Sequence, residues 1–245
     1  MQNVRWLTFG MASALTRTIL HFYPSSGNVS APYPVSCRLT IFAQGEVGNS
    51  ITVEGLRLSQ PEGIWVDEAF PVLRDNSVGF YGLEILLSCA QQRVDLDPSM
   101  CVIELLSAVQ STRFWPHRLD QATPEMAKQE ANLMPLFGDA FNTTSLVVLN
   151  YSNEAKQPSL SVNNKNGESV PLPGVPQQTI AARSVLELDF SKFPEALAVE
   201  QPTECGWGLL RGRGLRLEPS VNQELAYFAV YRDVLTKRPV SVCAL

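Results

Sequence analysis

The sequence predicts an all-β protein that consists of two tandem antiparallel β-sandwich domains with a short helical connector. Three observations lead to this fold class. Short segments with alternating apolar and polar side chains recur along the chain, turn-forming residues separate them, and the two halves share an apolar pattern. On this interpretation the first domain spans residues 1–110, the connector residues 111–136 and the second domain residues 137–245.

The alternation is clearest in residues 184–190, Ser-Val-Leu-Glu-Leu-Asp-Phe. Leu186 and Leu188 alternate there with Glu187 and Asp189, which is the period of two that a half-buried strand shows. Further strands, rich in apolar or aromatic residues, are expected at residues 37–43, 51–58, 79–89, 101–106, 145–150 and 224–231. So many short strands are typical of sandwich proteins.

The turn signals fit the same interpretation. Asn166-Gly167 lies between two short apolar segments, and because this dipeptide readily adopts positive φ it predicts a β-hairpin. The 17 prolines and 15 glycines are scattered along the chain, which favours many short strands over long helices. One helix is expected in the connector, where Thr123 can cap, Pro124 suits the first helical position and Pro135 ends the run.

An internal similarity indicates a duplication. Residues 94–99, Val-Asp-Leu-Asp-Pro-Ser, resemble residues 215–220, Leu-Arg-Leu-Glu-Pro-Ser, so that Leu96 aligns with Leu217. Without a gap, the same offset pairs Leu39 with Leu160, Ile41 with Val162, Ile64 with Val185 and Ala108 with Ala229. Similarity at a fixed period indicates a repeated structural unit. The alternative is one large sandwich or barrel in which the matching turns are coincidental.

Composition excludes several classes of protein. With 45% hydrophobic and 18% charged residues, the 245-residue chain can build a core, unlike a disordered protein. The net charge of −5 argues against nucleic-acid binding. No apolar run is long enough for a membrane span and the N-terminus lacks a secretory signal, so a cytoplasmic location is expected. Five cysteines without a Cys-x-x-Cys pair favour buried, reduced thiols.

Residues for catalysis or metal binding are scarce. His21 and His117 are the only histidines, which excludes a His-rich metal site, and no Gly-x-Ser-x-Gly turn accompanies them. The carboxylate pairs Asp67-Glu68 and Asp95 with Asp97 are interpreted as solvated side chains. We therefore expect no catalytic residue, no metal and no cofactor. Three N-glycosylation patterns, beginning at Asn28, Asn142 and Asn150, are assigned no function.

Residues 206–216 are the most unusual segment, with three arginines and four glycines among eleven residues. Backbone amides and guanidinium groups there could hold an anion, with a tryptophan as a stacking face. The alternative is a glycine-kinked hairpin with solvated arginines. The candidate ligand-binding residues are Trp207, Arg211, Arg213, Tyr227 and Tyr231.

Aromatic side chains offer a second kind of candidate, a platform for stacking a sugar. In the first half these are Trp65, Phe80 and Tyr81, and in the second half Trp207, Tyr227 and Tyr231. Aromatic residues in strands are more often part of the core, which is the interpretation that we favour.

The second half resembles the small β-sandwich proteins typified by the bacterial sensory-rhodopsin transducer. Residues 144–150, 180–186 and 231–233 carry this resemblance, whereas the first half departs from it. The resemblance implies oligomerising sandwiches that bind a protein or a small ligand, such as a sugar, without catalysis. It transfers no functional residue, and the tandem arrangement would be unusual for that family.

The leading functional hypothesis is a non-enzymatic binding or interaction module for a small molecule, a sugar or a protein. A homo-oligomer and a protein or carbohydrate partner are expected, without nucleic acid and without a membrane span. One alternative is a structural component of a larger assembly, such as a bacterial surface or virion part. Another is a glycoside hydrolase, because two carboxylates suffice for that chemistry.

Overall fold

The computed structural model describes residues 2–23, 35–43, 46–54, 62–74, 79–89, 101–119, 132–136, 141–163, 168–197, 213–217 and 224–244. Strands dominate these residues and the α-helices are two single turns, which confirms the all-β prediction. The chain divides into two compact units. The first holds residues 1–121 with residues 183–185 and 244, and the second holds the remaining residues.

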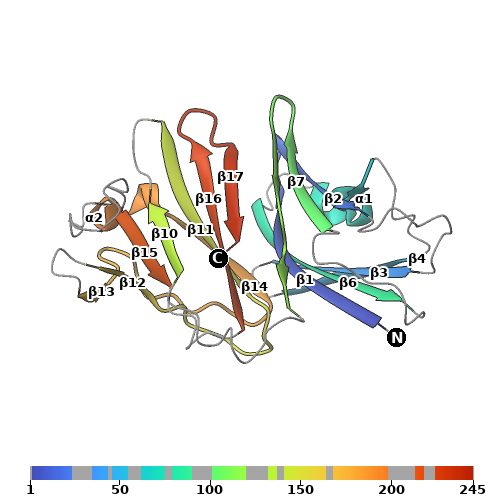
Figure 1. Ribbon diagram of the computed structural model, residues 1–245, viewed down its shortest axis with the longest axis horizontal. Coiled ribbons are helices and arrows are strands. Elements are labelled where there is room, and N and C mark those ends of the chain that lie inside the picture. The colour runs from blue at the N-terminus through green and yellow to red at the C-terminus, as the bar shows by residue number, and fades with distance from the viewer. Residues whose placement is uncertain are drawn as a thin grey trace. The chain divides into compact units, whose positions relative to one another are not determined.

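Two sheets form the first unit (Figure 1). One has the order β4-β3-β6-β1-β9, made of β1 (Gln2–Ala12), β3 (Val35–Ala43), β4 (Glu46–Glu54), β6 (Gly79–Cys89) and β9 (His117–Arg118). The other has the order β5-β2-β7-β8, made of β2 (Thr16–Phe22), β5 (Ile64–Trp65), β7 (Cys101–Ser107) and β8 (Ser111–Phe114). The helix α1 (Val66–Ala69) and the 3-10 helix η1 (Pro71–Arg74) follow β5.

The second unit also has two sheets. One has the order β10-β15-β12-β13, made of β10 (Asn132–Leu136), β12 (Leu160–Asn163), β13 (Ser169–Pro171) and β15 (Arg213–Leu217). The other has the order β14-β11-β16-β17, made of β11 (Asn142–Asn150), β14 (Ser184–Asp189), β16 (Leu225–Asp233) and β17 (Pro239–Ala244). The 3-10 helix η4 (Phe190–Lys192) and the helix α2 (Pro194–Leu197) follow β14.

The core of the second unit contains side chains from both of its sheets. Leu136 comes from β10, Leu146 and Val148 from β11, and Leu225 and Tyr227 from β16. Each sheet buries its apolar face against the other, which is the arrangement of a β-sandwich.

The two units share one strand order. The strands β4-β3-β6-β1 correspond to β13-β12-β15-β10, and the strands β5-β2-β7-β8 correspond to β14-β11-β16-β17. The strand β9 of the first unit has no counterpart among the described strands of the second. In both units one short α-helix and one 3-10 helix follow the first strand of the second sheet. That strand is β5 in the first unit and β14 in the second. The strand pairs of these sheets, such as β1 with β6 and β10 with β15, are antiparallel. This common topology supports the predicted duplication.

The gap-free alignment, by contrast, holds only in part. It pairs Leu39 in β3 with Leu160 in β12, which the topology also matches. However, Ala108 lies in the turn after β7 whereas Ala229 lies inside β16, so this pair is wrong. The connections between corresponding strands differ in length, so no single offset can align the two units. Residues 94–99 lie outside the described residues.

The predicted connector differs from the structure. Residues 111–114 form β8, which pairs with β7, and residues 117–118 form β9, which pairs with β1. The predicted helix ran to Pro135, but its last residues belong to β10, where Asn132 pairs with Leu217. Pairing with β15 therefore overrides the helix propensity of these residues. Pro135 is tolerated because β10 is an edge strand. Residues 120–131, which include Thr123 and Pro124, lie outside the described residues.

Two further expectations can be compared with the structure. The Asn166-Gly167 turn lies outside the described residues, but β12 and β13 on either side of it pair antiparallel, as the predicted hairpin requires. Cys37 and Cys101 are buried and free, as expected for reduced thiols, and Cys243 is free and exposed. Burial raises the pKa of the Cys37 thiol to about 12, so this thiol is unreactive at neutral pH.

Two glycines of the first unit lie directly opposite aromatic residues on neighbouring strands. Gly10 on β1 faces Tyr81 on β6, and Gly82 on β6 faces Phe42 on β3. A Cβ atom on Gly10 would lie 2.2 Å from the Tyr81 ring, and one on Gly82 would lie 2.1 Å from the Phe42 ring. Both rings are therefore packed against the backbone at positions that only glycine can occupy.

Candidate functional site

The structure places the predicted ligand-binding residues only in part. Trp207 and Arg211 lie outside the described residues, and Arg213 begins β15. Tyr227 is 6% exposed and belongs to the core of the second unit, and Tyr231, four residues further along β16, packs against that core. Burial raises the pKa of the Tyr231 hydroxyl to about 12. The anion site formed by the arginines stays a prediction.

The aromatic residues proposed for the first half are packing residues. Phe80 and Tyr81 are buried, and Trp65 is half-buried. The guanidinium group of Arg17 lies 4.0 Å from the centre of the Trp65 ring. One face of that ring is therefore covered by a cation.

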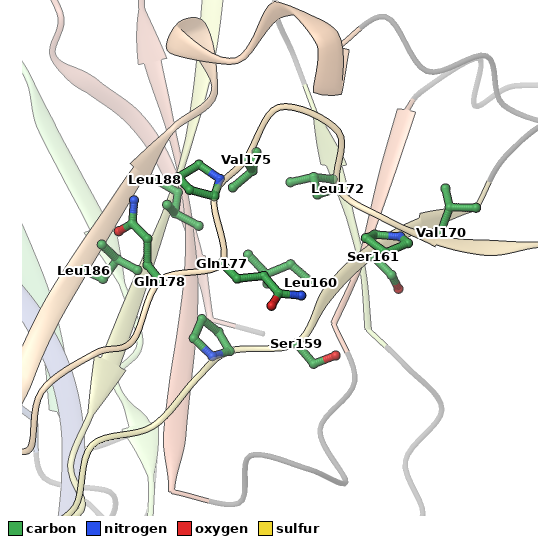
Figure 2. Close-up of a pocket in the computed structure, with 13 residues that line it drawn as sticks. Ser159, Leu160, Ser161, Val170, Leu172, Val175, Gln177, Gln178, Leu186 and Leu188 are labelled. Atoms are coloured by element: carbon green, nitrogen blue, oxygen red, sulfur yellow. The ribbon is translucent and has the colours of Figure 1, made fainter.

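A groove in the second unit has the shape to receive a ligand. We call it the β12–β14 groove, because residues of β12, β13, β14 and the segment 172–178 line it. Its volume is about 250 Å³. Figure 2 shows Leu172, Val175 and Leu188 gathered at one end, while the amide of Gln177 extends beside Leu160.

The lining of the β12–β14 groove is aliphatic with a neutral polar rim. None of its thirteen lining residues carries a charged side chain. Ser159, Ser161, Gln177 and Gln178 supply hydroxyl and amide groups. The Gln177 Oε1 atom accepts a hydrogen bond of 3.0 Å from Nε2 of Gln157, which orients the Gln177 amide and leaves its NH2 group as a donor at the rim. The groove therefore favours a neutral ligand, since an ion buried there would lack a partner.

The sequence did not predict this groove because its lining comes from three separate segments. The alternation of Leu186 and Leu188 indicated a strand, and both side chains do line the groove. Yet β13 and β14 are edge strands of different sheets, so the space between them exists only once the sheets are stacked. Three prolines, Pro158, Pro171 and Pro176, also line the groove, but they form no local motif.

The first unit has a smaller hollow of about 200 Å³ beside the turn between β1 and β2. Arg17, Asp67 and Arg74 contribute to its lining. Asp67 is not solvated as expected, because both of its carboxylate oxygens accept 2.8 Å hydrogen bonds from Arg17. Arg17 and Asp67 thus neutralise each other, while Nε of Arg74 donates to the backbone carbonyl of Asp67 at 3.2 Å.

A buried polar cluster lies across three strands of the first unit. His21 on β2 and Glu104 on β7 are 8% and 5% exposed, and His21 Nε2 lies 2.5 Å from Glu104 Oε2. The hydroxyl of Ser111 on β8 donates to Glu104 Oε1. Arg113, also on β8, places its guanidinium 3.4 Å from the same carboxylate. Sequence reasoning could not assemble this cluster, because its members meet only when the strand register is known.

The geometry of the cluster does not match a Ser-His-acid triad. In a triad the imidazole lies between the hydroxyl and the carboxylate and takes the proton of the hydroxyl. Here Glu104 lies between Ser111 and His21, so the hydroxyl donates to a carboxylate instead of an imidazole. His117 lies on β9, and burial lowers its pKa. The arrangement around Glu104 thus resembles a structural network more than a nucleophile with its base.

The Glu104 network predicts a loss of stability in acid. Burial raises the pKa of Glu104, but hydrogen bonds from Ser111 and His21 and the charge of Arg113 outweigh it, so the pKa lies below its ordinary value of 4.5. The unfolded chain therefore takes up this proton first as the pH falls. The stabilisation is present above pH 4.5 and is lost as the pH drops through the folded-state pKa. Urea unfolding across this range should show a steeper loss for the wild type than for Glu104→Gln, with the exposed Glu62→Gln as control. Equal slopes for the wild type and Glu104→Gln would contradict this expectation.

Asn150 begins an N-glycosylation pattern but has a structural role. Its side chain is fully buried, and Nδ2 donates to the backbone carbonyls of Glu154, Ile180 and Ala181 at 2.8–3.1 Å. Its Oδ1 accepts from the backbone N–H and the hydroxyl of Ser152 at 3.0 and 2.8 Å. One side chain therefore ties the end of β11 to two other segments.

The described residues contain no group of three or more histidine, cysteine, aspartate or glutamate side chains placed to hold a metal ion. Neither short helix among them has the length or apolar composition that a membrane-spanning helix needs. No protein-family model matches the chain, and none of the curated proteins matches it. The resemblance of the second half to the sensory-rhodopsin transducer stays a prediction.

Proposed function

We propose that this protein is a non-enzymatic binding module whose second unit takes a small neutral ligand in the β12–β14 groove. The observation that carries the proposal is the lining of the groove, which is aliphatic, free of charged side chains and rimmed by amides and hydroxyls. Such a lining is typical of ligand sites, in which apolar contacts supply affinity and a few polar groups fix orientation. The resemblance of the second half to a family that binds without catalysis supports the same proposal.

The size of the groove limits the ligand. A water molecule occupies about 30 Å³ in the liquid, so a groove of about 250 Å³ has the volume of roughly eight waters. This volume suits a metabolite or a single residue-sized group. The preferred ligand has an aliphatic part that reaches Leu160 and Leu188 and a carbonyl oxygen that accepts from the Gln177 amide.

The lining also argues against an enzyme at this place. A glycoside hydrolase needs two carboxyl groups that face each other across the bound sugar. None of the residues that line the β12–β14 groove is an aspartate, a glutamate or a histidine.

A matched pair of ligands tests the proposal. N-acetyl-leucine amide is neutral and has the features described above, whereas N-acetyl-leucine differs from it by a carboxylate in place of the amide. We expect the amide to bind measurably by ligand-observed NMR and the carboxylate to bind at least tenfold more weakly, because its charge would be desolvated without a partner.

Variants at the rim supply the controls. Gln177 is exposed, so Gln177→Trp should leave the fold intact, cover the groove and abolish binding. Gln177→Ala should weaken binding by up to about tenfold, the contribution of one neutral hydrogen bond. Gln157→Ala, which removes the supporting donor outside the lining, should have a smaller effect. Equal binding of both ligands, or undiminished binding by Gln177→Trp, would overturn the proposal.

A further inference from the structure

Two turns lie side by side at one end of each unit. In the second unit Asn142, the first residue of β11, pairs with Asp233, the last residue of β16. Phe141 therefore lies beside the turn that joins β16 to β17, and its carbonyl accepts a 2.8 Å hydrogen bond from the N–H of Val234. In the first unit Thr16 pairs with Ser107, which brings the corresponding turns together.

Large apolar side chains protrude from these paired turns. Phe141 and Leu235 are 76% and 89% exposed in the second unit, and Leu15 and Val109 are 56% and 74% exposed in the first. These four are half of the eight large apolar side chains that are exposed among the described residues. Single exposed apolar residues are ordinary, but adjacent pairs at the same place in two units need an explanation.

The turn that carries Leu235 is held by hydrogen bonds and has a net positive charge. Asp233 Oδ1 accepts hydrogen bonds from the backbone N–H groups of Leu235 and Thr236 at 3.1 and 2.7 Å. The carboxylate of Asp233 therefore points toward the backbone of the turn. Lys237 has a φ of 57° and donates its N–H to the Asp233 carbonyl. The exposed Lys237 and the half-buried Arg238 then follow the apolar residue.

We propose that Phe141, Leu235, Lys237 and Arg238, which we call the β11/β16 tip, attach the protein to an anionic lipid surface. The two apolar side chains would enter the interface between headgroups, and the two cations would meet the anionic headgroups. The tip is convex, and a fluid lipid interface accommodates a convex apolar projection without a preformed complementary pocket. Since the chain has a net charge of −5, this local positive charge also sets the side that approaches an anionic surface.

The first unit provides a matched internal control. Its corresponding turns, residues 13–15 and 108–110, project Leu15 and Val109 but contain no charged residue. If lipid binding needs both apolar contact and positive charge, the protein should bind through the β11/β16 tip. Binding should depend little on the turns of the first unit.

Cosedimentation of the full-length chain with vesicles tests this inference. We expect binding to vesicles of phosphatidylcholine with about a quarter phosphatidylserine, and at least fivefold weaker binding to phosphatidylcholine alone. The double variant Phe141→Ser, Leu235→Ser should reduce binding about tenfold or more, because both apolar anchors are lost. Lys237→Asn, which keeps a residue that tolerates positive φ, should reduce it about fivefold on the anionic vesicles only. Leu15→Ser, Val109→Ser should bind as the wild type does.

Several outcomes would overturn the inference. They are a wild-type chain that does not sediment with the anionic vesicles, equal binding to both vesicle types, and an equal loss in the first-unit control. A wild-type dimer on size-exclusion chromatography that Phe141→Ser, Leu235→Ser dissociates, without lipid binding, would assign the tip to a second copy instead. All four substituted apolar residues are exposed, so unchanged melting temperatures should confirm that the variants fold.

Discussion

Replacing Asn150 by alanine is expected to lower the free energy of unfolding by about 3–5 kcal/mol. The substitution removes the Nδ2 donor from the carbonyls of Ile180 and Ala181, although the Ile180 carbonyl still accepts from the N–H of Lys156. It also removes the acceptor for the backbone N–H and the hydroxyl of the buried Ser152. Each buried polar group that loses its partner costs about 1–3 kcal/mol. Urea unfolding followed by tryptophan fluorescence measures the change.

Two variants separate this network from a simple loss of packing. Ser152→Ala removes one hydroxyl and leaves the bonds from Asn150 to Ile180 and Ala181, so we expect a loss of about 1 kcal/mol. Asn150→Asp keeps the acceptor but replaces the donors by a buried charge, so it should be at least as damaging as Asn150→Ala. A loss below about 1 kcal/mol for Asn150→Ala would show that water replaces these hydrogen bonds.

Gly10→Ala is expected to destabilise the first unit by about 3 kcal/mol or more. The added Cβ atom would lie 2.2–2.5 Å from three atoms of the Tyr81 side chain, which is itself 1% exposed and has little room to move. The strain must therefore displace either the ring or the β1–β6 pairing. The midpoint of urea unfolding reports this loss.

A double-mutant cycle tests whether the Tyr81 ring is the cause. Tyr81→Leu removes the ring atoms that meet the new Cβ, so the double variant should be more stable than the sum of the single losses predicts, by at least about 1 kcal/mol. Gly79→Asn is the control, because nothing lies within 4 Å of its Cβ position and asparagine tolerates its φ of 70°. Strict additivity in the cycle would contradict this explanation.

The strands with a clear apolar pattern could be predicted from the sequence. The alternation of Leu186 with Leu188 located β14, and the apolar run 145–150 located β11. The helical interpretation of residues up to Pro135 failed at β10, because local propensity cannot anticipate pairing with a strand almost eighty positions away. The part of a fold that depends on such non-local pairing therefore cannot be predicted from local sequence patterns.

The duplication and the candidate sites show the same limit. A common strand order unites the units, but unequal connections defeat a gap-free comparison, so that Ala108 and Ala229 were paired wrongly. The Glu104 cluster needs the register that sets Ile19 opposite Glu104, and the β12–β14 groove needs two sheets stacked with their edges together. Neither has a local motif. The arginine-glycine segment does have a local motif, but residues 206–212, which include Arg211, lie outside the described residues.

The groove of the second unit is the centre of this functional account, and residue-resolved NMR of the full-length chain tests it most directly. On titration with N-acetyl-leucine amide, we predict that backbone amide shifts change at Leu160, Gln177 and Leu188 and leave β2 and β7 of the first unit unchanged. Shift changes concentrated away from residues 158–188, or none at millimolar ligand, would contradict the assignment of ligand binding to this groove.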